Sequence, residues 1–249
     1  MKNVIDISKY QGAVDFGRAK ASGKVDGVMI RAVSTNSGGI YIDPYMERSY
    51  AECKRLGIPC GAYYYTYAQT PAQADAELDM LRKALAGKVF EYPIAVDVED
   101  NLLRPLSAAA LTDLVIRAVK AIEGWGCYAM VYTYANYRQT ELDMSRLAAY
   151  DLWIADYRGA RPGMAHGMWQ YSSRGRVPGV TGYVDLNYAY KDYPAIISAA
   201  GLNDLTGMGA TPAPAPLYTA TVGPVSGGDL ARVQALAKEL AVPCAAQEV

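Results

Sequence analysis

The sequence predicts an α/β fold, an irregular TIM-like barrel with eight strands and fewer helices in its second half, followed by a small C-terminal βαβ appendage. Eight short segments are rich in Val, Ile, Tyr and Ala and are bounded by Gly, Pro or Asp, as strands commonly are. Amphipathic segments of helical period separate the early strands, and this alternation favours a parallel sheet. Eight such strands favour closure into a barrel.

The elements follow one another in a regular order up to residue 188. Helices are expected at 43–56, 71–86 and 107–123. Gly57 ends the first of them, Pro71 suits the first turn of the second, and Ser107 is an N-cap for the third. The strands are expected at 4–8, 25–34, 59–68, 92–99, 128–134, 151–157, 167–172 and 183–188.

The intervals between strand ends predict a barrel that is unevenly covered. A strand and its crossover helix take roughly 30 residues. Up to residue 134, successive strand ends are far enough apart in the sequence for a crossover helix. From residue 134 to residue 188 the intervals between strand ends are shorter. We therefore expect loops or very short helices between the last strands, so that helices coat one side of the barrel and leave the other side thin.

Composition bounds the size and the partners of the fold. The 249 residues are 51% hydrophobic and 20% charged, which suffices for a sizeable core in one large domain. The net charge is −1 and no basic stripe is present, so we expect no nucleic-acid partner. No apolar run approaches the ~18 residues of a membrane span, and the amino terminus lacks the apolar core of a signal peptide.

Cysteine and histidine usage predicts a site without metal or cofactor. The four cysteines form no C-x-x-C pair, and their spacing suits neither a zinc site nor a disulfide scaffold, so we expect mostly buried thiols. His166 is the only histidine, which excludes zinc hydrolases with two or three histidine ligands. We expect His166 to have a structural role or to lie on the surface, and not to be a catalytic group.

The composition changes after residue 200. We assign residues 1–200 to the barrel, 201–216 to a linker rich in Pro, Ala and Gly, and 217–249 to a βαβ segment. A segment of this size is too small to fold stably on its own. We expect it to dock on the barrel or to pair with a second copy of the chain.

Acidic residues gather at the ends of the expected strands. Asp97 and Glu99 are two residues apart at the carboxyl end of strand 92–99, so both side chains point to one side of the sheet. Barrel enzymes place their chemistry at this end, and Asp6, Asp156 and Asp185 occupy the matching place on three other strands. The alternative to a functional site is that these acids cap helices or bind a divalent cation.

Clustered carboxyl groups suit the breaking of a glycosidic bond. This reaction needs an acid that protonates the leaving oxygen and a negative group near the oxocarbenium-like centre. Mutual repulsion and partial burial raise the pKa of one carboxyl group, which keeps it protonated near neutrality. The acids therefore indicate a glycoside hydrolase.

Aromatic residues complete this pattern. The chain has 21 Tyr and 3 Trp but only 2 Phe, so it prefers rings that carry a polar group. Such rings can stack on sugar faces while their polar groups bond to sugar oxygens. Any one of them can instead fill the barrel, but the set favours a sugar groove that includes Asp156 and the rings of Tyr63, Tyr65, Tyr132, Trp169 and Tyr171.

Nine motifs follow one another in order: D-I-S-K-Y-Q-G (6–12), V-D-F (14–16), I-R-A (30–32), D-P-Y (43–45), G-I-P-C-G-A-Y-Y-Y (57–65), A-V-D-V-E-D (95–100), W-I-A-D-Y (153–157), W-Q-Y-S (169–172) and V-D-L-N (184–187). Together they resemble the glycoside hydrolase family 25 muramidases, the Chalaropsis-type lysozymes of phage endolysins and bacterial autolysins. The resemblance covers roughly residues 3–195.

The resemblance implies an irregular barrel that cleaves the β-1,4 bond between N-acetylmuramic acid and N-acetylglucosamine in peptidoglycan. Glu99 would be the proton donor. Asp97 would stabilise the positive centre or the acetamido group of the substrate, with Asp6 and Asp185 completing the acidic floor and Asn187 contacting substrate. Whether the anomeric configuration is retained stays open. The protein would act at the bacterial cell wall, and without a signal peptide we expect its release by lysis, holin or other non-classical export. Residues 217–249 lie outside the resemblance, and we expect them to pair two chains or to bind the wall.

Two other interpretations stay open on the sequence. One is a non-catalytic peptidoglycan-binding protein on a hydrolase scaffold, although the four acids are intact. The other is a chitinase-like N-acetylglucosaminidase, which also ends a barrel strand in D-x-E. That family carries further acids upstream on the same strand, where this chain has Ile94 and Ala95.

Overall fold

The computed structural model describes residues 1–209 and Val233. The chain divides into two units, Met1–Ala210 and Thr211–Val249, and residues 1–209 form the fold of the first. The βαβ segment expected at 217–249 and most of the expected linker lie outside the described residues.

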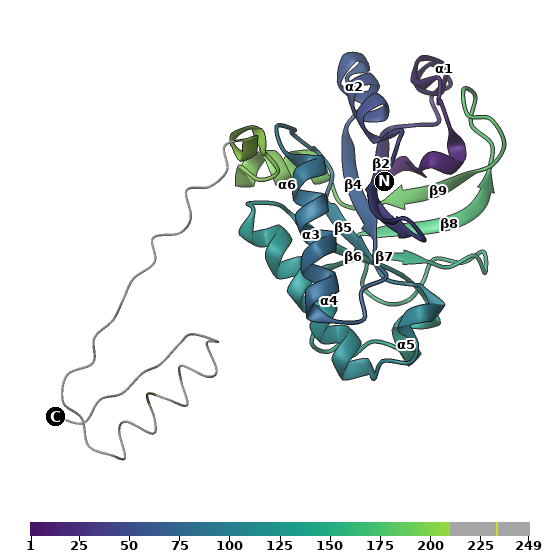
Figure 1. Ribbon diagram of the computed structural model, residues 1–249. Coiled ribbons are helices and arrows are strands. Elements are labelled where there is room, and N and C mark those ends of the chain that lie inside the picture. The colour runs from purple at the N-terminus through teal and green to yellow at the C-terminus, as the bar shows by residue number, and fades with distance from the viewer. Residues whose placement is uncertain (210–232, 234–249) are drawn as a thin grey trace. The chain divides into compact units, whose positions relative to one another are not determined.

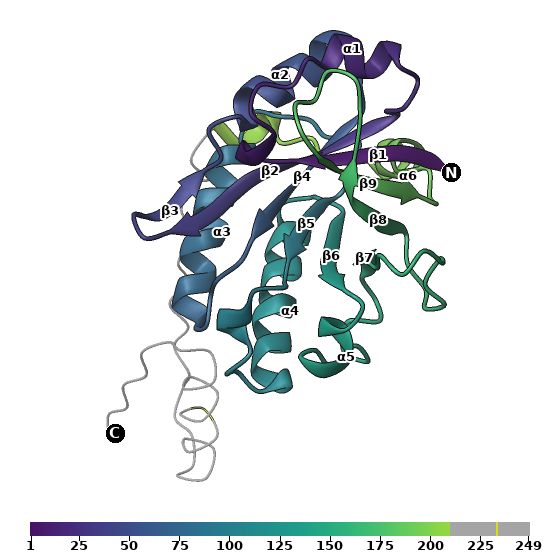
Figure 2. The same ribbon diagram turned by 90° about the vertical axis from the view of Figure 1, so that its right-hand side faces the viewer.

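The first unit is built on a closed barrel of eight strands (Figures 1 and 2). Pairing of the first strand with the second closes the sheet, and all eight strands overlap the predicted ones. A ninth strand, β3 (Gly39–Ile42), was not predicted and forms a hairpin with β2. The barrel strands are β1 (Lys2–Ile7), β2 (Gly27–Asn36), β4 (Cys60–Tyr65), β5 (Ile94–Asp97), β6 (Ala129–Tyr134), β7 (Asp151–Ala155), β8 (Met168–Gly175) and β9 (Val184–Ala189).

The last strand corrects the expectation of a parallel sheet. From β1 through β2 and β4 to β8, neighbouring strands are parallel, but β9 runs antiparallel to both β8 and β1. The connection 176–183 contains no helix, and parallel neighbours need a crossover of a dozen or more residues. Asp185 therefore lies at the amino end of β9, which reaches the same rim as the carboxyl ends of the parallel strands.

The three predicted helices are present and cover one side of the barrel (Figure 1). They are α2 (Met46–Leu56), α3 (Pro71–Leu85) and α4 (Ala108–Gly124). The Ser107 hydroxyl accepts a hydrogen bond from the Ala110 amide, which confirms the predicted N-cap. The sequence pattern did not predict the shorter α1 (Phe16–Ala21), α5 (Tyr137–Thr140) and α6 (Tyr193–Ala200).

The opposite side of the barrel is thin, as the strand spacing predicts. Between β7 and β9, within residues 156–183, the structure has loops and no helix (Figure 1). Aromatic side chains of β8, of β9 and of the residue after β9, with Met164 from the loop after β7, take the place of a helix there. The members of this outer layer are Met164, Trp169, Tyr171, Tyr188 and Tyr190, which pack on Leu152 and Ile154.

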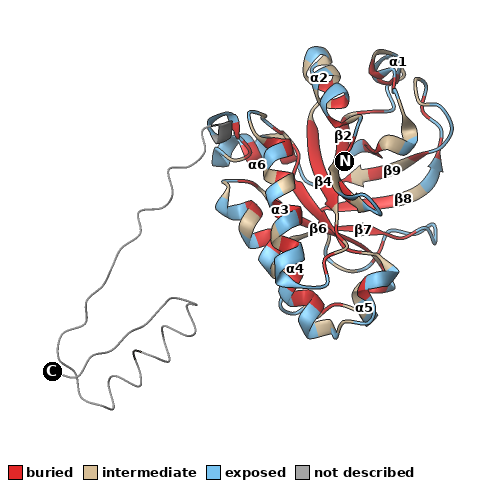
Figure 3. Cartoon of the chain, in the orientation of Figure 1, coloured by how far each residue is buried: buried red, intermediate tan, exposed pale blue. Residues whose placement is uncertain are grey.

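The barrel strands are largely buried (Figure 3), and their buried side chains form two main clusters. Ile5, Ile94 and Val96 point outward and pack under the helices. Their neighbours in the strands point inward, because side chains alternate along a strand. The interior is filled by large side chains that include Met29, Met130, Trp153 and Met168.

Residues 201–205 belong to the barrel and not to the linker as expected. Leu205 is buried, and its amide donates to the Lys88 carbonyl. Asn203 is buried as well and accepts from the Tyr128 amide through its side chain. Because of these contacts, the barrel domain extends beyond residue 200. In the described part of the chain, no helix combines the length and hydrophobicity that crossing a bilayer requires.

Candidate active site

Strand register brings the four predicted catalytic acids to one rim of the barrel. Asp97 is the last residue of β5, and Glu99 follows two residues later. Asp6 near the end of β1 lies directly opposite Asp185 near the start of β9. Asp6 and Asp97 are 5% and 4% exposed, whereas Glu99 and Asp185 are half-buried. The acids therefore form a floor with two buried and two accessible members.

Two amide side chains fix the orientation of Asp6. Gln170 Nε2 donates to Asp6 Oδ2 at 2.9 Å, and Asn187 Nδ2 donates to the same oxygen at 2.8 Å. Asn187 Oδ1 in turn accepts from Trp153 Nε1 at 2.7 Å. Asn187 is 1% exposed and its amide is occupied, so the structure places it behind Asp6. This corrects the expectation that Asn187 contacts substrate.

Burial raises the pKa of all four acids. It raises the pKa of Glu99 to about 7, opposed by a hydrogen bond with Tyr132 and assisted by repulsion from Asp185 and Asp100. Burial raises the pKa of Asp185 to about 6. For Asp6 and Asp97, burial and then repulsion by the other acids raise the pKa well above its ordinary value.

Asp97 has an oxygen without a partner. Its buried Oδ1 has no hydrogen-bond partner among the described residues. Arg31, which is paired with Asp43 at 2.8 Å, opposes the rise in the Asp97 pKa. A buried carboxyl oxygen without a donor is costly, so Asp97 keeps an unused acceptor at the rim of the barrel.

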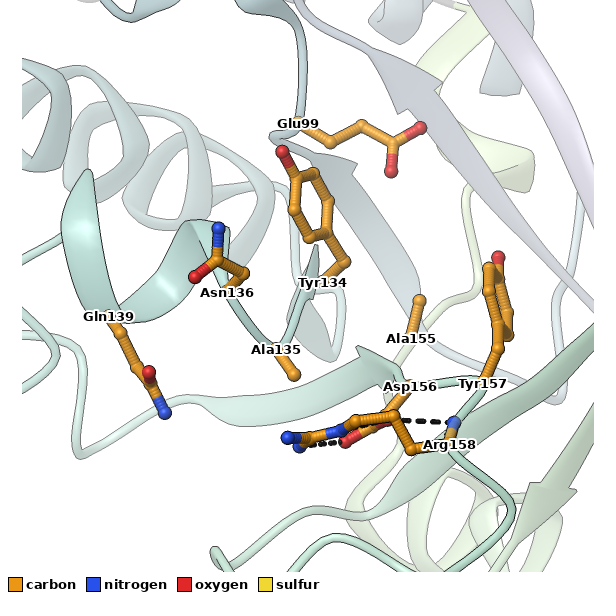
Figure 4. A pocket seen from close by; sticks show the side chains of 9 residues that line it. All are labelled: Glu99, Tyr134, Ala135, Asn136, Gln139, Ala155, Asp156, Tyr157 and Arg158. Carbon is orange, nitrogen blue, oxygen red and sulfur yellow. Dashed lines mark hydrogen bonds and ion pairs between the residues drawn. The ribbon is translucent and has the colours of Figure 1, made fainter.

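A cavity of about 330 Å³ opens beside these acids (Figure 4). Of the four, Glu99 lines this cavity, and its carboxyl group points into the space between Tyr134 and Tyr157. The pKa is raised in all four acids, so the pKa directions do not distinguish among them. Glu99 differs from the other three by its position, because it is the one of the four that a molecule in the cavity would meet. The other lining residues are Tyr134, Ala135, Asn136, Gln139, Ala155, Asp156, Tyr157 and Arg158.

Asp156 lies in the cavity wall as one half of an ion pair. Arg158 Nε donates to Asp156 Oδ1 at 2.9 Å, and a second guanidinium nitrogen lies 2.5 Å from Oδ2 (Figure 4). The hydrogen bonds from Arg158 lower the pKa of Asp156. Asp156 is therefore ionised near neutrality and presents a paired carboxylate to the cavity.

Three of the five predicted aromatic residues face the acids. Tyr63 is buried, and burial first, then Asp6, raises its pKa. The Tyr65 hydroxyl donates to Asp100 Oδ2 at 3.0 Å, and that of Tyr132 donates to Gln170 Oε1 at 2.9 Å.

Trp169 and Tyr171 are not part of this group. Tyr171 stacks on Tyr188 in the outer layer, with ring centroids 4.3 Å apart. Trp169 Nε1 donates to the Asp156 carbonyl, and its ring lies in the same outer layer. Gln170 between them points inward to Asp6, so alternation along β8 directs both rings outward. The structure thus does not bring these two predicted residues to the site.

The sequence interpretation missed Tyr157, Arg158 and Gln170. Tyr157 and Arg158 follow W-I-A-D directly, so the carboxyl end of β7 was the available signal. Gln170 is the middle residue of W-Q-Y, and its inward direction could have been inferred from the large rings on both sides of it.

The remaining expectations on single residues concern His166 and the cysteines. His166 Nδ1 lies 2.7 Å from the Met164 carbonyl, and its ring packs on Tyr190, away from the acids. Cys53, Cys60 and Cys127 are buried free thiols, as expected. Within residues 1–209, no three His, Cys, Asp or Glu side chains converge as ligands for a metal ion.

The raised pKa values of these acids predict how the stability of the fold depends on pH. A carboxyl group whose pKa is raised on folding contributes stability that is fully present below its unfolded pKa and is lost as pH rises through its folded pKa. The ordinary pKa values of Asp185 and Glu99 are 3.8 and 4.5 and the folded values are about 6 and about 7, so this loss runs from about pH 4 to about pH 7. We expect the melting temperature at pH 5 to exceed that at pH 8 by several degrees in calorimetry at constant ionic strength. A double replacement of Glu99 by Gln and Asp185 by Asn should flatten this slope; an equal slope in both proteins would contradict the assignment.

A closed α/β barrel with carboxyl groups gathered at one rim beside a polar, aromatic cavity is the arrangement of a glycoside hydrolase. A sequence model described as glycosyl hydrolases family 25 matches residues 5–180, and the chain belongs to this family. This confirms the resemblance seen in the motifs.

Relatives agree with this membership. An autolytic lysozyme of Clostridium acetobutylicum is 31% identical over 185 residues, covering 74% of this chain and 54% of the relative. The modular autolysin LytC of Streptococcus pneumoniae has a similar structure, with a TM-score of 0.66 and 27% identity over 75% of this chain and 46% of LytC. The structure of a bacterial lysozyme from Streptomyces coelicolor gives a TM-score of 0.65 at 25% identity. The match covers 82% of this chain and 96% of the lysozyme chain. The chain spans about half the length of the first two relatives.

Proposed function

We propose that the chain is an N-acetylmuramidase that hydrolyses the β-1,4 bond between N-acetylmuramic acid and N-acetylglucosamine in peptidoglycan. The observation that carries the proposal is Glu99, which lines the cavity and has a pKa of about 7. A carboxyl group with this pKa holds a proton at neutral pH and gives it up readily. Membership of the family, relatives named as lysozymes and a LytC structure with a synthetic peptidoglycan ligand support the choice of substrate.

In this proposal, Glu99 transfers its proton to the glycosidic oxygen as the bond to the anomeric carbon breaks. The electron pair of that bond leaves with the oxygen, and positive charge develops on the sugar. The resulting Glu99 carboxylate then takes a proton from the water that completes the hydrolysis. This is the role of general acid followed by general base.

Asp97 accepts the N–H of the acetamido group on the sugar whose bond is cleaved. Its buried Oδ1, which lacks a partner among residues 1–209, supports this role. The hydrogen bond holds the acetamido carbonyl toward the anomeric carbon, where that oxygen can stabilise the developing positive charge. Asp6 and Asp185 complete the acidic floor, and their repulsion of Glu99 and Asp97 helps to keep protons in the site.

The sugar contacts in this proposal come from the cavity wall and the inward tyrosines. Glycan hydroxyl groups are both donors and acceptors, so they suit the Asp156–Arg158 pair, Asn136 and the hydroxyl of Tyr157. Tyr63, Tyr65 and Tyr132 lie nearer the acids. The site of action is the bacterial cell wall, and pairing of two chains through residues 217–249 stays a prediction.

The products of cell-wall digestion test the proposal against both alternatives. Purified protein and peptidoglycan should give new reducing ends that carry muramic acid, identified by borohydride reduction and mass spectrometry. Reducing ends of N-acetylglucosamine alone would support the chitinase-like alternative. Binding to walls without new reducing ends would support a non-catalytic scaffold.

A further inference from the structure

The rim across the barrel from the cavity carries a lysine set against two tyrosine rings. Lys9 lies two residues after β1, and its Nζ is 4.7 Å from the ring centroid of Tyr41 in β3 and 5.6 Å from that of Tyr10. Tyr10 is 78% exposed, whereas Lys9 and Tyr41 are half-buried. In the ring of eight strands, β1 and β2 stand opposite β6 and β7, whose carboxyl ends line the cavity (Figure 2).

The neighbours of Tyr41 show which side of the β2–β3 hairpin it occupies. Thr35 Oγ1 donates to Glu77 Oε1 of α3 at 3.3 Å, so Thr35 points outward to the helices. The preceding residue, Ser34, then points inward, because side chains alternate along a strand. Tyr41 is paired with Ser34, and paired residues share one face. Tyr41 and the ammonium group of Lys9 therefore lie on the inner side of the hairpin, at the barrel end that holds the acids.

The charge of Lys9 is not neutralised by the barrel. Asp43 accepts from the Lys9 backbone amide at 2.8 Å, but its carboxylate is already paired with the buried Arg31. The Arg31 guanidinium lies 5.3 Å from the ring centroid of Tyr10, which adds a second cation at this rim. Among residues 1–209, no carboxylate forms an ion pair with Lys9. An ammonium group held by aromatic rings and without an anion of its own is suited to an anionic group of a ligand.

The proposed function indicates which sugar reaches this side of the site. Glu99 lines the cavity and protonates the leaving oxygen, so the leaving sugar occupies the cavity. The muramic acid whose bond is broken then lies on the other side of Glu99, over Asp97 and toward β1. Muramic acid differs from N-acetylglucosamine by a lactyl ether on O3, which ends in a carboxylate or continues into a peptide that carries carboxylates. Lys9 therefore lies on the side where this distinguishing group is expected.

We propose that Lys9 is a specificity-determining residue that binds a carboxylate of the lactyl or peptide substituent of muramic acid, with the rings of Tyr10 and Tyr41 holding its ammonium group in place. This carboxylate lies away from the bond that breaks, so its contact is equally strong in the bound substrate and in the transition state. Such a contact lowers KM and leaves kcat unchanged. This inference rests on the proposed function.

Replacement of Lys9 by Met tests the proposal on soluble, uncross-linked glycan chains that carry their peptides. Met keeps an unbranched side chain against the two rings but has no charge, so the fold should persist. We expect KM to rise about 5-fold with kcat unchanged, which is the size of effect typical of one partly exposed ion pair. The difference should shrink as ionic strength rises. The matched control is Lys2→Met, an exposed lysine at the opposite end of β1, which should leave KM as in the wild type.

Chemically altered chains show whether a carboxylate is the ligand and which one it is. After conversion of all carboxyl groups to methylamides with carbodiimide, the wild type and Lys9→Met should have the same KM. A penalty on intact chains assigns a peptide carboxylate, whereas a penalty confined to chains whose peptides an amidase has removed assigns the lactyl carboxylate. An equal KM for both proteins on intact and on trimmed chains would overturn the proposal, and so would an equal penalty on the methylamide chains.

A binding measurement separates failure of this proposal from failure of the proposed function. Calorimetry with the same chains compares Glu99→Gln with the double variant Glu99→Gln/Lys9→Met and needs no hydrolysis. We expect Kd to be about 5-fold higher in the double variant. A wild-type protein that releases no muramic-acid reducing ends would contradict the proposed function. Normal release by the wild type, together with an equal Kd in the two variants, would contradict the role of Lys9 alone.

Discussion

Replacement of Glu99 by Gln is expected to lower the rate of peptidoglycan hydrolysis about 1,000-fold, since a positioned general acid contributes about 10²–10⁴-fold. Gln keeps the size of the side chain but has no acidic proton to give to the leaving oxygen. It also removes a buried, repelled carboxyl group, so folding should not suffer. The measurement is the release of muramic-acid reducing ends, with wall binding followed by co-sedimentation. We expect binding to be kept.

Asp100→Asn is the matched control for this experiment. Asp100 is the next acid in the chain, but its carboxylate accepts from the Leu102 amide and the Tyr65 hydroxyl and does not line the cavity. Most of the activity should survive this change. If instead Asp100→Asn were inactive and Glu99→Gln active, the assignment of the proton donor would be wrong.

Replacement of Asp97 by Asn is expected to separate activity from stability. The rate should fall about 100-fold, the typical effect of removing one electrostatic contact to a transition state. Stability at pH 7 should rise, because a buried carboxyl group with a raised pKa destabilises the fold at neutral pH. Hydrolysis assays and calorimetry at the same pH measure the two effects.

The stability gain of Asp97→Asn should depend on pH in a defined direction. Below about pH 3, the native and unfolded carboxyl groups are both largely protonated, so the variant should gain little there. A gain that is equal at about pH 3 and about pH 7 would point to altered packing and not to the removal of a raised pKa. A loss of stability at pH 7 would contradict the account of Asp97.

Much of the fold could be predicted because its signals are local. Strands such as 94–97 combine β-branched residues with Pro or Gly at their borders, and helix caps such as Ser107 act within a few residues. The placement of Asp97 and Glu99 on one side of β5 follows from the period of a strand. Short helices such as α1 and α6 carry too few turns for a periodic pattern.

The incorrect expectations about the site depended on contacts distant in sequence. The pairing shows that β9 is antiparallel, with Asp185 at its amino end beside Asp6, which the strand pattern alone did not indicate. The directions of Trp169 and Tyr171 depend on which face of β8 meets the barrel interior, and Gln170 takes that face. Because one residue of register exchanges the two faces of a strand, motif residues alone did not determine which side chains reach the acids.

The most direct test is a titration of the Glu99 carboxyl carbon by NMR in the otherwise intact protein, with assignment by its loss in Glu99→Gln. The acidic floor of the barrel predicts a midpoint near pH 7, and a fall of this midpoint when Asp185 is replaced by Asn, since repulsion from Asp185 contributes to the shift. A midpoint near 4.5, the ordinary value for a glutamate, would show that Glu99 is ionised at neutral pH and holds no proton for the leaving oxygen.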